Sequence, residues 1–240
     1  MMLKIINLTK KFEVEEQEIK ALDQVNLEVS NGEFCTIIGP SGCGKSTFLR
    51  IIAGLETKNN GELVWDNPPK LGYVFQNYAL FPYLSVFENI EFGLKMEGMP
   101  VHDRTKIVME LIEEVGLTGF EDKHPKELSG GMKQRVGIAR SLSIDPNVLL
   151  LDEPFSSVDE FTAESLRDLL LKLWQKRKIT IIMVTHLIRE ALEMADQIVV
   201  MTPRPGTVEK ILKNDLKRPR NLRSGEFFKM EDKLRELIKF

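Results

Sequence analysis

A glycine-rich stretch in the first quarter of the chain has the residue types and the spacing needed to hold a polyphosphate. It fits the pattern G-x-x-x-x-G-K-[S/T] and consists of Gly39, Pro40, Ser41, Gly42, Cys43, Gly44, Lys45, Ser46 and Thr47. Its glycines let successive backbone N–H groups point inward, and a following helix adds the positive end of its dipole. Lys45 supplies a charge for the β and γ phosphates, and the Ser46 hydroxyl can ligate Mg²⁺. The stretch is a predicted nucleotide-binding P-loop.

The segments on either side of this loop supply the context that the motif needs. Residues 33–38 have the pattern of a buried strand, and residues 47–53 have the pattern of a helix. A strand, a loop and a helix in this order are the structure in which a P-loop works. The competing interpretation, a glycine-rich turn without a ligand, is disfavoured by the intact motif and its flanks.

Two carboxylates follow a second buried run. Residues 147–153 are apolar up to Asp152 and Glu153, which is typical of a strand covered on both faces of a parallel sheet. Ligands of open α/β sheets lie at the carboxyl ends of the strands, so we expect this pair beside the P-loop phosphates. Asp152 then suits a Mg²⁺ shell, and Glu153 can polarise an attacking water. Without the P-loop, the pair would be interpreted as a solvated strand end.

A histidine ends a third buried run in the same way. Residues 180–184 predict a parallel strand, and His186 follows it closely. A lone histidine is usually structural, but this position favours contact with the γ-phosphate. Helices are predicted at 160–177 and 188–195, and a strand at 197–201 completes the core.

Composition limits the function classes. The 240 residues carry 33 Lys and Arg against 36 Asp and Glu, a net charge of −3 that does not favour binding to nucleic acid. No apolar run is long enough for a membrane span and no signal peptide is evident, so we expect a cytosolic chain. Cys35 and Cys43 predict reduced thiols rather than a disulfide. Because Cys43 precedes a helix and lies near Lys45, we expect a reactive thiolate.

The remaining segments predict a strand-rich start and a helical middle. Residues 3–8 and 25–29 alternate like edge strands of an antiparallel piece, and Phe12, between them, favours a core position over an adenine platform. Residues 62–66 predict a hairpin strand before another core strand at 71–75. Asp103 is a candidate cap for a helix reaching residue 115. The helical character of residues 85–145 predicts a subdomain inserted into an α/β core.

An aromatic stretch follows Gln76 without a clean period. It includes Tyr78, Leu80, Phe81 and Tyr83 around a proline. A satellite cluster under a loop and a docking surface for another protein are equally favoured.

Residues 128–135 form the most family-specific motif of the chain. Their sequence, Leu-Ser-Gly-Gly-Met-Lys-Gln-Arg, resembles the LSGGQ-type signature of ABC-transporter ATPases. Ser129, Gly130 and Gly131 at a helix start form a second anion site. Because the chain already has a P-loop, a second phosphate site suggests a head-to-tail dimer around two ATP molecules. Met132 stands where the family most often has Gln.

The resemblance covers residues 3–215 and assigns roles to matching positions. It implies that Phe12 stacks on adenine, that Gln76 contacts Mg²⁺ and couples to the membrane partner, and that Asp159 lies in the D-loop. It also implies the Walker B role for Asp152 and the switch role for His186, although Leu187 replaces a frequent Asp. The implied catalytic residues are Lys45, Gln76, Glu153 and His186. Ser46, Gln76 and Asp152 are the implied metal contacts.

The implied fold is α/β, a RecA-like P-loop NTPase core with an N-terminal antiparallel β piece and an inserted α-helical subdomain. Residues 1–240 form one ABC ATPase domain. Its core comprises 1–84 and 146–215, the helical subdomain 85–145, and the C-terminal tail and helix 216–240. Residues 201–206 and 216–220 resemble those of nitrate, sulfonate and taurine-type importers. The basic residues within 204–223 favour a solvated surface over a lipid-headgroup site.

The function implied by the resemblance is ATP hydrolysis that drives import of a small anion. The partners would be a second copy of the chain, integral membrane permease subunits docking between Gln76 and Phe92, and a separate solute-binding protein. The chain would then lie on the inner face of the cell membrane. An ABC ATPase for lipid export or cell division is the alternative, and a soluble mechanoenzyme is a further one. The signature at 128–135 excludes a plain P-loop kinase.

Overall fold

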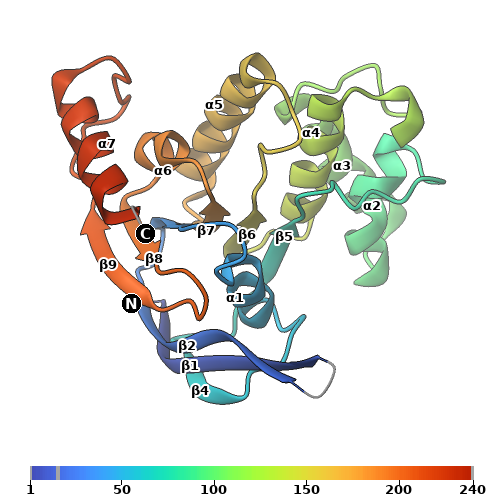
Figure 1. The fold of residues 1–240 in the computed structure, drawn as a ribbon. Coiled ribbons are helices and arrows are strands. Elements are labelled where there is room, and N and C mark those ends of the chain that lie inside the picture. The colour runs from blue at the N-terminus through green and yellow to red at the C-terminus, as the bar shows by residue number, and fades with distance from the viewer. Residues whose placement is uncertain (1, 15–16, 239–240) are drawn as a thin grey trace. The chain divides into compact units, whose positions relative to one another are not determined.

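The computed structural model describes residues 2–14 and 17–238 and divides the chain into two units. Unit 1 comprises the residues up to Pro69 and those from Ile179 onward, and unit 2 comprises Lys70–Lys178. Both units combine strands with helices, so the α/β class expected from the sequence is confirmed (Figure 1).

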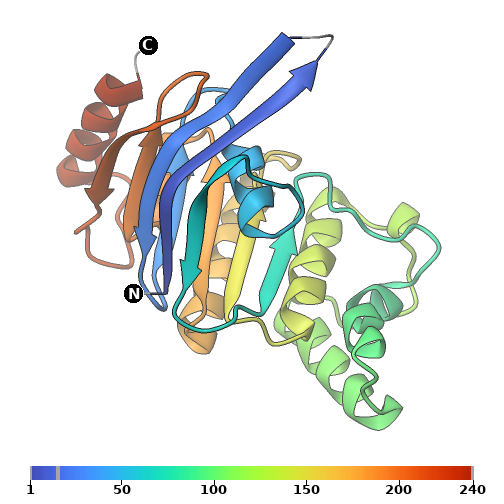
Figure 2. The same cartoon turned by 90° about the horizontal axis from the view of Figure 1, so that it is seen from below.

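Unit 1 begins with an antiparallel sheet of three strands in the order β2-β1-β4. These strands are β1 (Leu3–Val14), β2 (Gln17–Val29) and β4 (Asn60–Trp65). The antiparallel piece is confirmed, but β1 is its central strand and not an edge. The predicted hairpin at 62–66 is wrong, because β4 pairs with β1, with Trp65 opposite Leu3 (Figure 2). Alternation of polar and apolar residues predicts a strand but not its neighbour.

The second set of strands in unit 1 runs in the order β7-β3-β8-β9. Strands β3 (Phe34–Ile38), β7 (Thr180–Thr185) and β8 (Gln197–Met201) are parallel, and β9 (Val208–Lys213) pairs with β8 in the antiparallel sense. Every residue of β3 and β7 is buried, as their uninterrupted apolar runs predict. Ile38 lies opposite Thr185. The P-loop and His186 therefore leave the sheet at the same edge.

Unit 2 contains the parallel pair β5 (Leu71–Val74) and β6 (Val148–Asp152) and most of the helices. The helices are α2 (Val86–Met96), α3 (Val101–Glu114), the short η1 (Pro125–Glu127), α4 (Gly130–Ser143) and α5 (Glu160–Arg177). Helices α2, α3 and α4 gather beside one another (Figure 1), which confirms the helical character of this segment. Among the described residues, no helix is both long and apolar enough to cross a bilayer.

Local sequence explains how two of these helices begin. Ser85 and Glu88 form a reciprocal capping box at the start of α2. Helix α3 begins after Pro100, and Asp103 lies in its first turn, so the predicted capping role of Asp103 is wrong. A carboxylate in the first turn still favours the helix through its dipole.

Two arginines of the segment after β9, Arg218 and Arg220, bind the C-terminal end of α6 (Ile188–Met194) in unit 1. Arg218 donates to the carbonyl of Met194 and to Asp196, both at 2.6 Å, and Arg220 donates to the carbonyl of Glu193 at 3.0 Å. Only 2% of the Arg220 side chain is exposed, and burial lowers its pKa to about 10. For these two arginines the expected solvated surface is wrong, because they bind carbonyls that the last turn of a helix leaves without partners.

The last helix, α7 (Gly225–Ile238), packs on α6 through a buried carboxylate (Figure 1). Glu231 is 3% exposed and accepts from Arg235 at 2.6 Å and from Arg189 of α6 at 3.2 Å. Burial raises the pKa of Glu231, but the hydrogen bonds from the two arginines outweigh it and hold the pKa below its ordinary value.

We predict that Glu231→Gln lowers the free energy of unfolding by about 1–2 kcal/mol at neutral pH, because it removes the negative charge that strengthens the hydrogen bonds from the two arginines. A depressed carboxyl pKa contributes stability that is present above the unfolded pKa and lost as pH falls through the folded one. The difference from the parent should therefore shrink below pH ~4.3. Urea denaturation across pH measures it, with the exposed Glu236→Gln as the control. A difference independent of pH would contradict the ion-pair account.

Candidate nucleotide site

The Lys45 side chain is folded over the P-loop. Its ammonium group donates to the carbonyl of Gly39 at 2.8 Å and to that of Pro40 at 3.0 Å, and the residue is only 5% exposed. Lys45 is the first residue of α1 (Lys45–Ile52), so the helix begins inside the motif. Backbone carbonyls thus hold the charge of Lys45 next to the loop's N–H groups, where an anionic phosphate would bind.

The loop needs its glycines for conformation and for space. The N–H of Cys43 donates to the carbonyl of Pro40 at 3.3 Å, which closes a tight turn with Gly42 at φ +73°. Gly44 has φ +106°, and a Cβ added there would lie 2.8 Å from the carbonyl oxygen of Ala21 in β2. The spacing of the motif is therefore fixed by backbone sterics as well as by the ligand.

The structure reverses one expectation about the loop. Cys43 is 1% exposed, and burial raises the pKa of its thiol even though Lys45, with its Nζ 4.0 Å from the sulfur, acts in the opposite direction. The predicted reactive thiolate is wrong, because desolvation outweighs the nearby charge. Cys35 in β3 is also a buried free thiol with a raised pKa.

In unit 2, Asp152 ends β6 and is 3% exposed. The Tyr73 hydroxyl of β5 donates to its Oδ2 at 3.0 Å. Sequence reasoning missed Tyr73, because an aromatic residue in a core strand gives no sign of what its hydroxyl reaches. The bond fixes the orientation of a carboxylate that is one of three candidate Mg²⁺ ligands.

The candidate cation ligands have the chemistry that Mg²⁺ prefers. Ser46, Gln76 and Asp152 offer a hydroxyl, an amide and a carboxylate, all hard oxygen donors. Within the described residues no group of three or more His, Cys, Asp or Glu side chains could hold a metal on its own. Magnesium ions in proteins usually take further ligands from phosphates and water.

Glu153 and Gln76 lie together in unit 2. The Gln76 amide donates to the Glu153 Oε2 and to the Ser156 hydroxyl, both at 3.4 Å, and the Ser157 hydroxyl donates to the Gln76 carbonyl at 3.2 Å. Glu153 has φ +44°, a left-handed conformation that is costly for a residue with a side chain. A strained backbone thus aims the candidate general base beside the amide of Gln76.

The signature and the D-loop start neighbouring helices. Ser129 caps α4 by accepting from the Met132 N–H at 3.3 Å, and Asp159 caps α5 by accepting from the Thr162 N–H at 3.1 Å. The hydrogen bonds from Thr162 hold the pKa of Asp159 below its ordinary value. A Cβ added at Gly131 would overlap the Thr162 side-chain methyl. Close packing therefore requires glycine there, in addition to any anion site.

Two further residues of the predicted nucleotide site, Phe12 and His186, belong to unit 1. Phe12 lies in β1 opposite Ile19, with the Lys10 ammonium 4.6 Å from its ring centroid. It is half-buried, so the expected core position is met only in part. His186 is exposed just past the end of β7.

The aromatic stretch is both packed and exposed. Phe81 has its ring centroid 4.5 Å from that of Phe92, and Asn89 bonds to both its N–H and its carbonyl. Tyr83, however, is 71% exposed, with its ring 6.0 Å from Phe81. Features of both alternatives, a satellite cluster and an exposed surface, are present.

Comparison with known proteins decides the family. The ABC transporter family model matches residues 22–156. An aliphatic sulfonates import ATP-binding protein of Bacillus cereus is 44% identical, with 98% of this chain and 94% of the relative covered. An ABC transporter ATP-binding protein of Methanocaldococcus jannaschii, itself uncharacterized, is 47% identical over 99% of this chain and 91% of the relative. The chain belongs to the ABC transporter family.

Solved structures agree with this assignment. A dimeric ATP-binding cassette in a post-hydrolysis state, bound to ADP and Pi, matches with a TM-score of 0.80 at 36% identity, covering 89% of this chain and 99% of that one. The P-loop NTPase fold expected from the sequence is thereby confirmed. This ABC ATPase binds and hydrolyses ATP.

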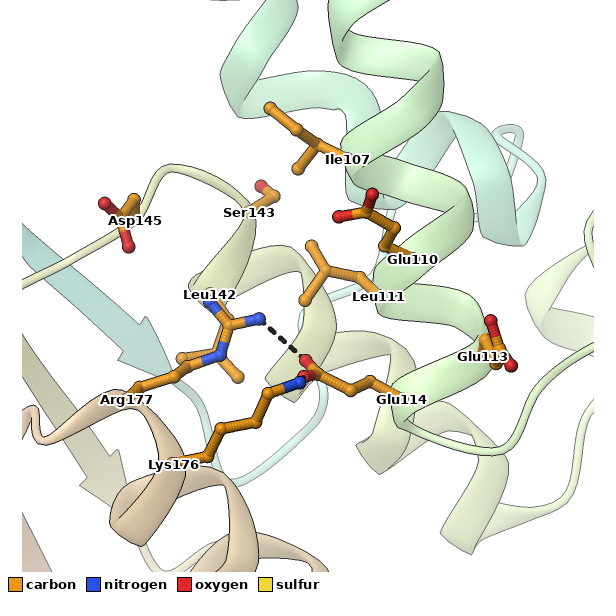
Figure 3. A pocket seen from close by; sticks show the side chains of 10 residues that line it. All are labelled: Ile107, Glu110, Leu111, Glu113, Glu114, Leu142, Ser143, Asp145, Lys176 and Arg177. Carbon is orange, nitrogen blue, oxygen red and sulfur yellow. Dashed lines mark hydrogen bonds and ion pairs between the residues drawn. The ribbon is translucent and has the colours of Figure 1, made fainter.

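A separate cleft of about 700 Å³ lies in unit 2 of the ABC ATPase (Figure 3). Carboxylates of α3 and the ends of α4 and α5 line it, and Glu114 pairs there with Lys176 and Arg177. None of the predicted nucleotide-site residues lines this cleft.

We predict that Cys43 of this ABC ATPase reacts slowly with iodoacetamide at neutral pH, because its thiol is buried and its pKa is raised. In a Cys35→Ala background, alkylation of the folded chain should be at least ~10-fold slower than that of the urea-unfolded chain at the same pH. Mass spectrometry over time gives both rates. Equal rates would show that the thiolate forms readily in the folded loop.

Proposed function

We propose that the chain is the ATPase subunit of an importer for a small anion, an aliphatic sulfonate being the first candidate, and that it works as a head-to-tail dimer around two MgATP. The observation that carries this proposal is the 44% identity, over 98% of the chain, to an aliphatic sulfonates import ATP-binding protein. Residues 201–206 and 216–220 also resemble those of nitrate, sulfonate and taurine-type importers.

Residues of unit 1 hold the nucleotide in this proposal. The Lys45 ammonium leaves the carbonyls of Gly39 and Pro40 for the β and γ phosphates, and the P-loop amides bind the same oxygens. Phe12 offers an aromatic face for adenine. His186, which leaves the sheet at the same edge as the P-loop, donates to the γ-phosphate.

Residues of unit 2 activate water and complete the cation shell. Glu153, beside the Gln76 amide, accepts a proton from the attacking water. Asp152, Gln76 and Ser46 would hold Mg²⁺, which supplies charge neutralisation at the phosphate oxygens when bound. The Tyr73 hydroxyl donates to one oxygen of Asp152 and so orients the carboxylate that would hold the cation.

A second copy of the chain supplies the remaining anion donors. Ser129, Gly130 and Gly131 open α4, and Asp159 opens the adjoining α5. The Ser129 oxygen accepts from Met132, so its own hydrogen can still be donated to a phosphate. The dimeric form of the matching cassette with ADP and Pi supports this arrangement.

The aromatic stretch is the proposed docking surface for membrane permease subunits. Tyr83 supplies exposed apolar area, and Phe81 anchors the stretch to α2. Arg140 of α4 lies 5.7 Å from the Phe81 ring and donates to the carbonyls of Tyr78 and Ala79. Movement at this surface would therefore reach the signature helix. A solute-binding protein outside the cell and attachment to the inner face of the membrane complete the proposal.

We predict that Phe81→Ala with Tyr83→Ala releases the membrane partner while ATP binding survives, because both side chains lie outside the P-loop. The tagged chain is purified from membranes of its own cells, and co-purifying integral membrane protein is quantified. Uptake of labelled alkanesulfonate by the same cells, with nitrate compared, measures function. The control is Phe120→Ala, an exposed aromatic residue outside the stretch.

Retention of the membrane partner by the double variant would contradict the docking surface. Alkanesulfonate uptake that is unchanged in cells carrying only Lys45→Ala would contradict the importer function. If these cells lost nitrate uptake but kept normal sulfonate uptake, the transported anion would be nitrate, and the importer function would still hold.

A further inference from the structure

The turn between β8 and β9, residues 202–207, lies directly against the P-loop (Figures 1 and 2). A Cβ added at Gly206 would overlap the Cys43 carbonyl, and one added at Gly39 would lie 2.9 Å from the carbonyl oxygen of Met201. The two backbones therefore touch on both sides of the phosphate-binding turn. The sequence suggested only a solvated basic surface here.

This β8–β9 turn is held firmly by its own bonds and by β2. The Thr207 N–H donates to the Thr202 hydroxyl at 2.9 Å, and the two threonine hydroxyls are 3.0 Å apart. The Gly206 N–H donates to the Ala21 carbonyl at 2.9 Å, and the Asp23 N–H donates to the Gly206 carbonyl at 3.0 Å. The backbone that carries the Arg204 side chain is therefore held in place by hydrogen bonds within the turn and to β2.

Arg204 holds the P-loop from outside. Its Nε and Nη2 both donate to the Gly42 carbonyl oxygen at 3.2 Å. On the other edge of the same peptide plane, the Cys43 N–H donates to the Pro40 carbonyl. Because a peptide unit is planar and trans, the two bonds together fix the orientation of the Gly42–Cys43 plane. The N–H groups of Gly44 and Lys45 follow directly after this plane in the loop.

We propose that Arg204 is a positioning residue of the nucleotide site, which clamps the Gly42–Cys43 peptide so that the loop is in its phosphate-binding shape before ATP arrives. The inference rests on the proposed role of the P-loop in holding the phosphates. A cradle ordered in advance binds more tightly, since less ordering entropy is lost on binding. The Arg204 guanidinium also places a positive charge on the outer side of the P-loop, the loop that is proposed to bind the negatively charged phosphates.

The test compares Arg204→Met and Arg204→Lys in the full chain, with Lys210→Met as the matched control. Lys210 is an exposed cation of the neighbouring strand β9. Equilibrium dissociation constants for MgATP and MgADP are measured with fluorescent analogues, at low salt and at about 1 M salt, where electrostatic effects between exposed charges are screened. Steady-state hydrolysis gives KM and kcat, and thermal melting without nucleotide reports on the fold.

For Arg204→Met we expect about fivefold to tenfold weaker binding of both nucleotides, because the bonds that hold the Gly42 carbonyl are lost. The defect should persist at high salt, KM should rise with kcat retained, and melting without nucleotide should change little. Arg204→Lys, which can donate a single bond to the same carbonyl, should recover part of the affinity. Lys210→Met should bind as the parent does.

Binding by Arg204→Met equal to that of Lys210→Met would overturn the inference. A defect that disappears at high salt would also overturn it, because Arg204 would then act through charge and not by positioning. If Arg204→Met does not fold, Arg204→Lys provides the test. Nucleotide affinity of Arg204→Lys equal to that of the parent at both salt concentrations would then overturn the role of the two hydrogen bonds from Arg204. If the parent chain itself bound neither nucleotide, the proposed function would fail, which is a distinguishable result.

Discussion

Close packing of backbone on backbone around the P-loop is the constraint on which the site in unit 1 depends. Gly39 and Gly206 leave no room for a side chain, and Gly44 approaches the carbonyl of Ala21 in β2. The loop is therefore enclosed by β2 and by the turn that follows β8, and its own Lys45 covers its carbonyls. Such enclosure keeps the N–H groups oriented without a ligand, and it uses positive φ angles at Gly42 and Gly44 that glycine adopts readily.

In unit 2 the corresponding constraint is the contact between the N-terminal turns of α4 and α5. Gly131 packs on Thr162, which itself bonds to the Asp159 cap, so the first turn of α4 is in direct contact with the first turn of α5. The Tyr78 hydroxyl donates to the carbonyl of Ser157, and Arg140 binds the carbonyl of Tyr78. The segment after Gln76 is thus bonded to the residues just before α5 and to the last turn of α4. A displacement at the aromatic stretch would be passed to α4 and α5, whose first residues are proposed phosphate contacts.

The sequence predicted the strands that carry chemistry well, because buried parallel strands are continuous apolar runs and functional groups follow their carboxyl ends. Strands β3, β6 and β7 were found in this way, and helix α5 was found from apolar residues at helical spacing. Pairing partners were harder: β1 is central and β9 was missed, since a half-polar strand looks alike at an edge or inside a sheet.

Hydrogen bonds from side chains to groups far away in the sequence were beyond prediction. Tyr73, Arg204 and Arg220 each act on a group far away in the chain, and residue type alone does not say which. The reactive thiolate expected at Cys43 failed for a related reason, because only the structure shows that desolvation exceeds the attraction to Lys45.

The central claim is that each ATP is held by the P-loop of one chain and the signature of another. It is tested most directly by mixing two inactive variants, Lys45→Ala and Ser129→Arg, and measuring ATP hydrolysis under conditions in which the parent is active. A mixed dimer has one site with an intact Lys45 and an intact Ser129, so the account predicts that the mixture regains activity that neither variant has alone. Activity of the mixture no greater than the sum of the separate variants would show that each chain uses its own signature, and would contradict the account.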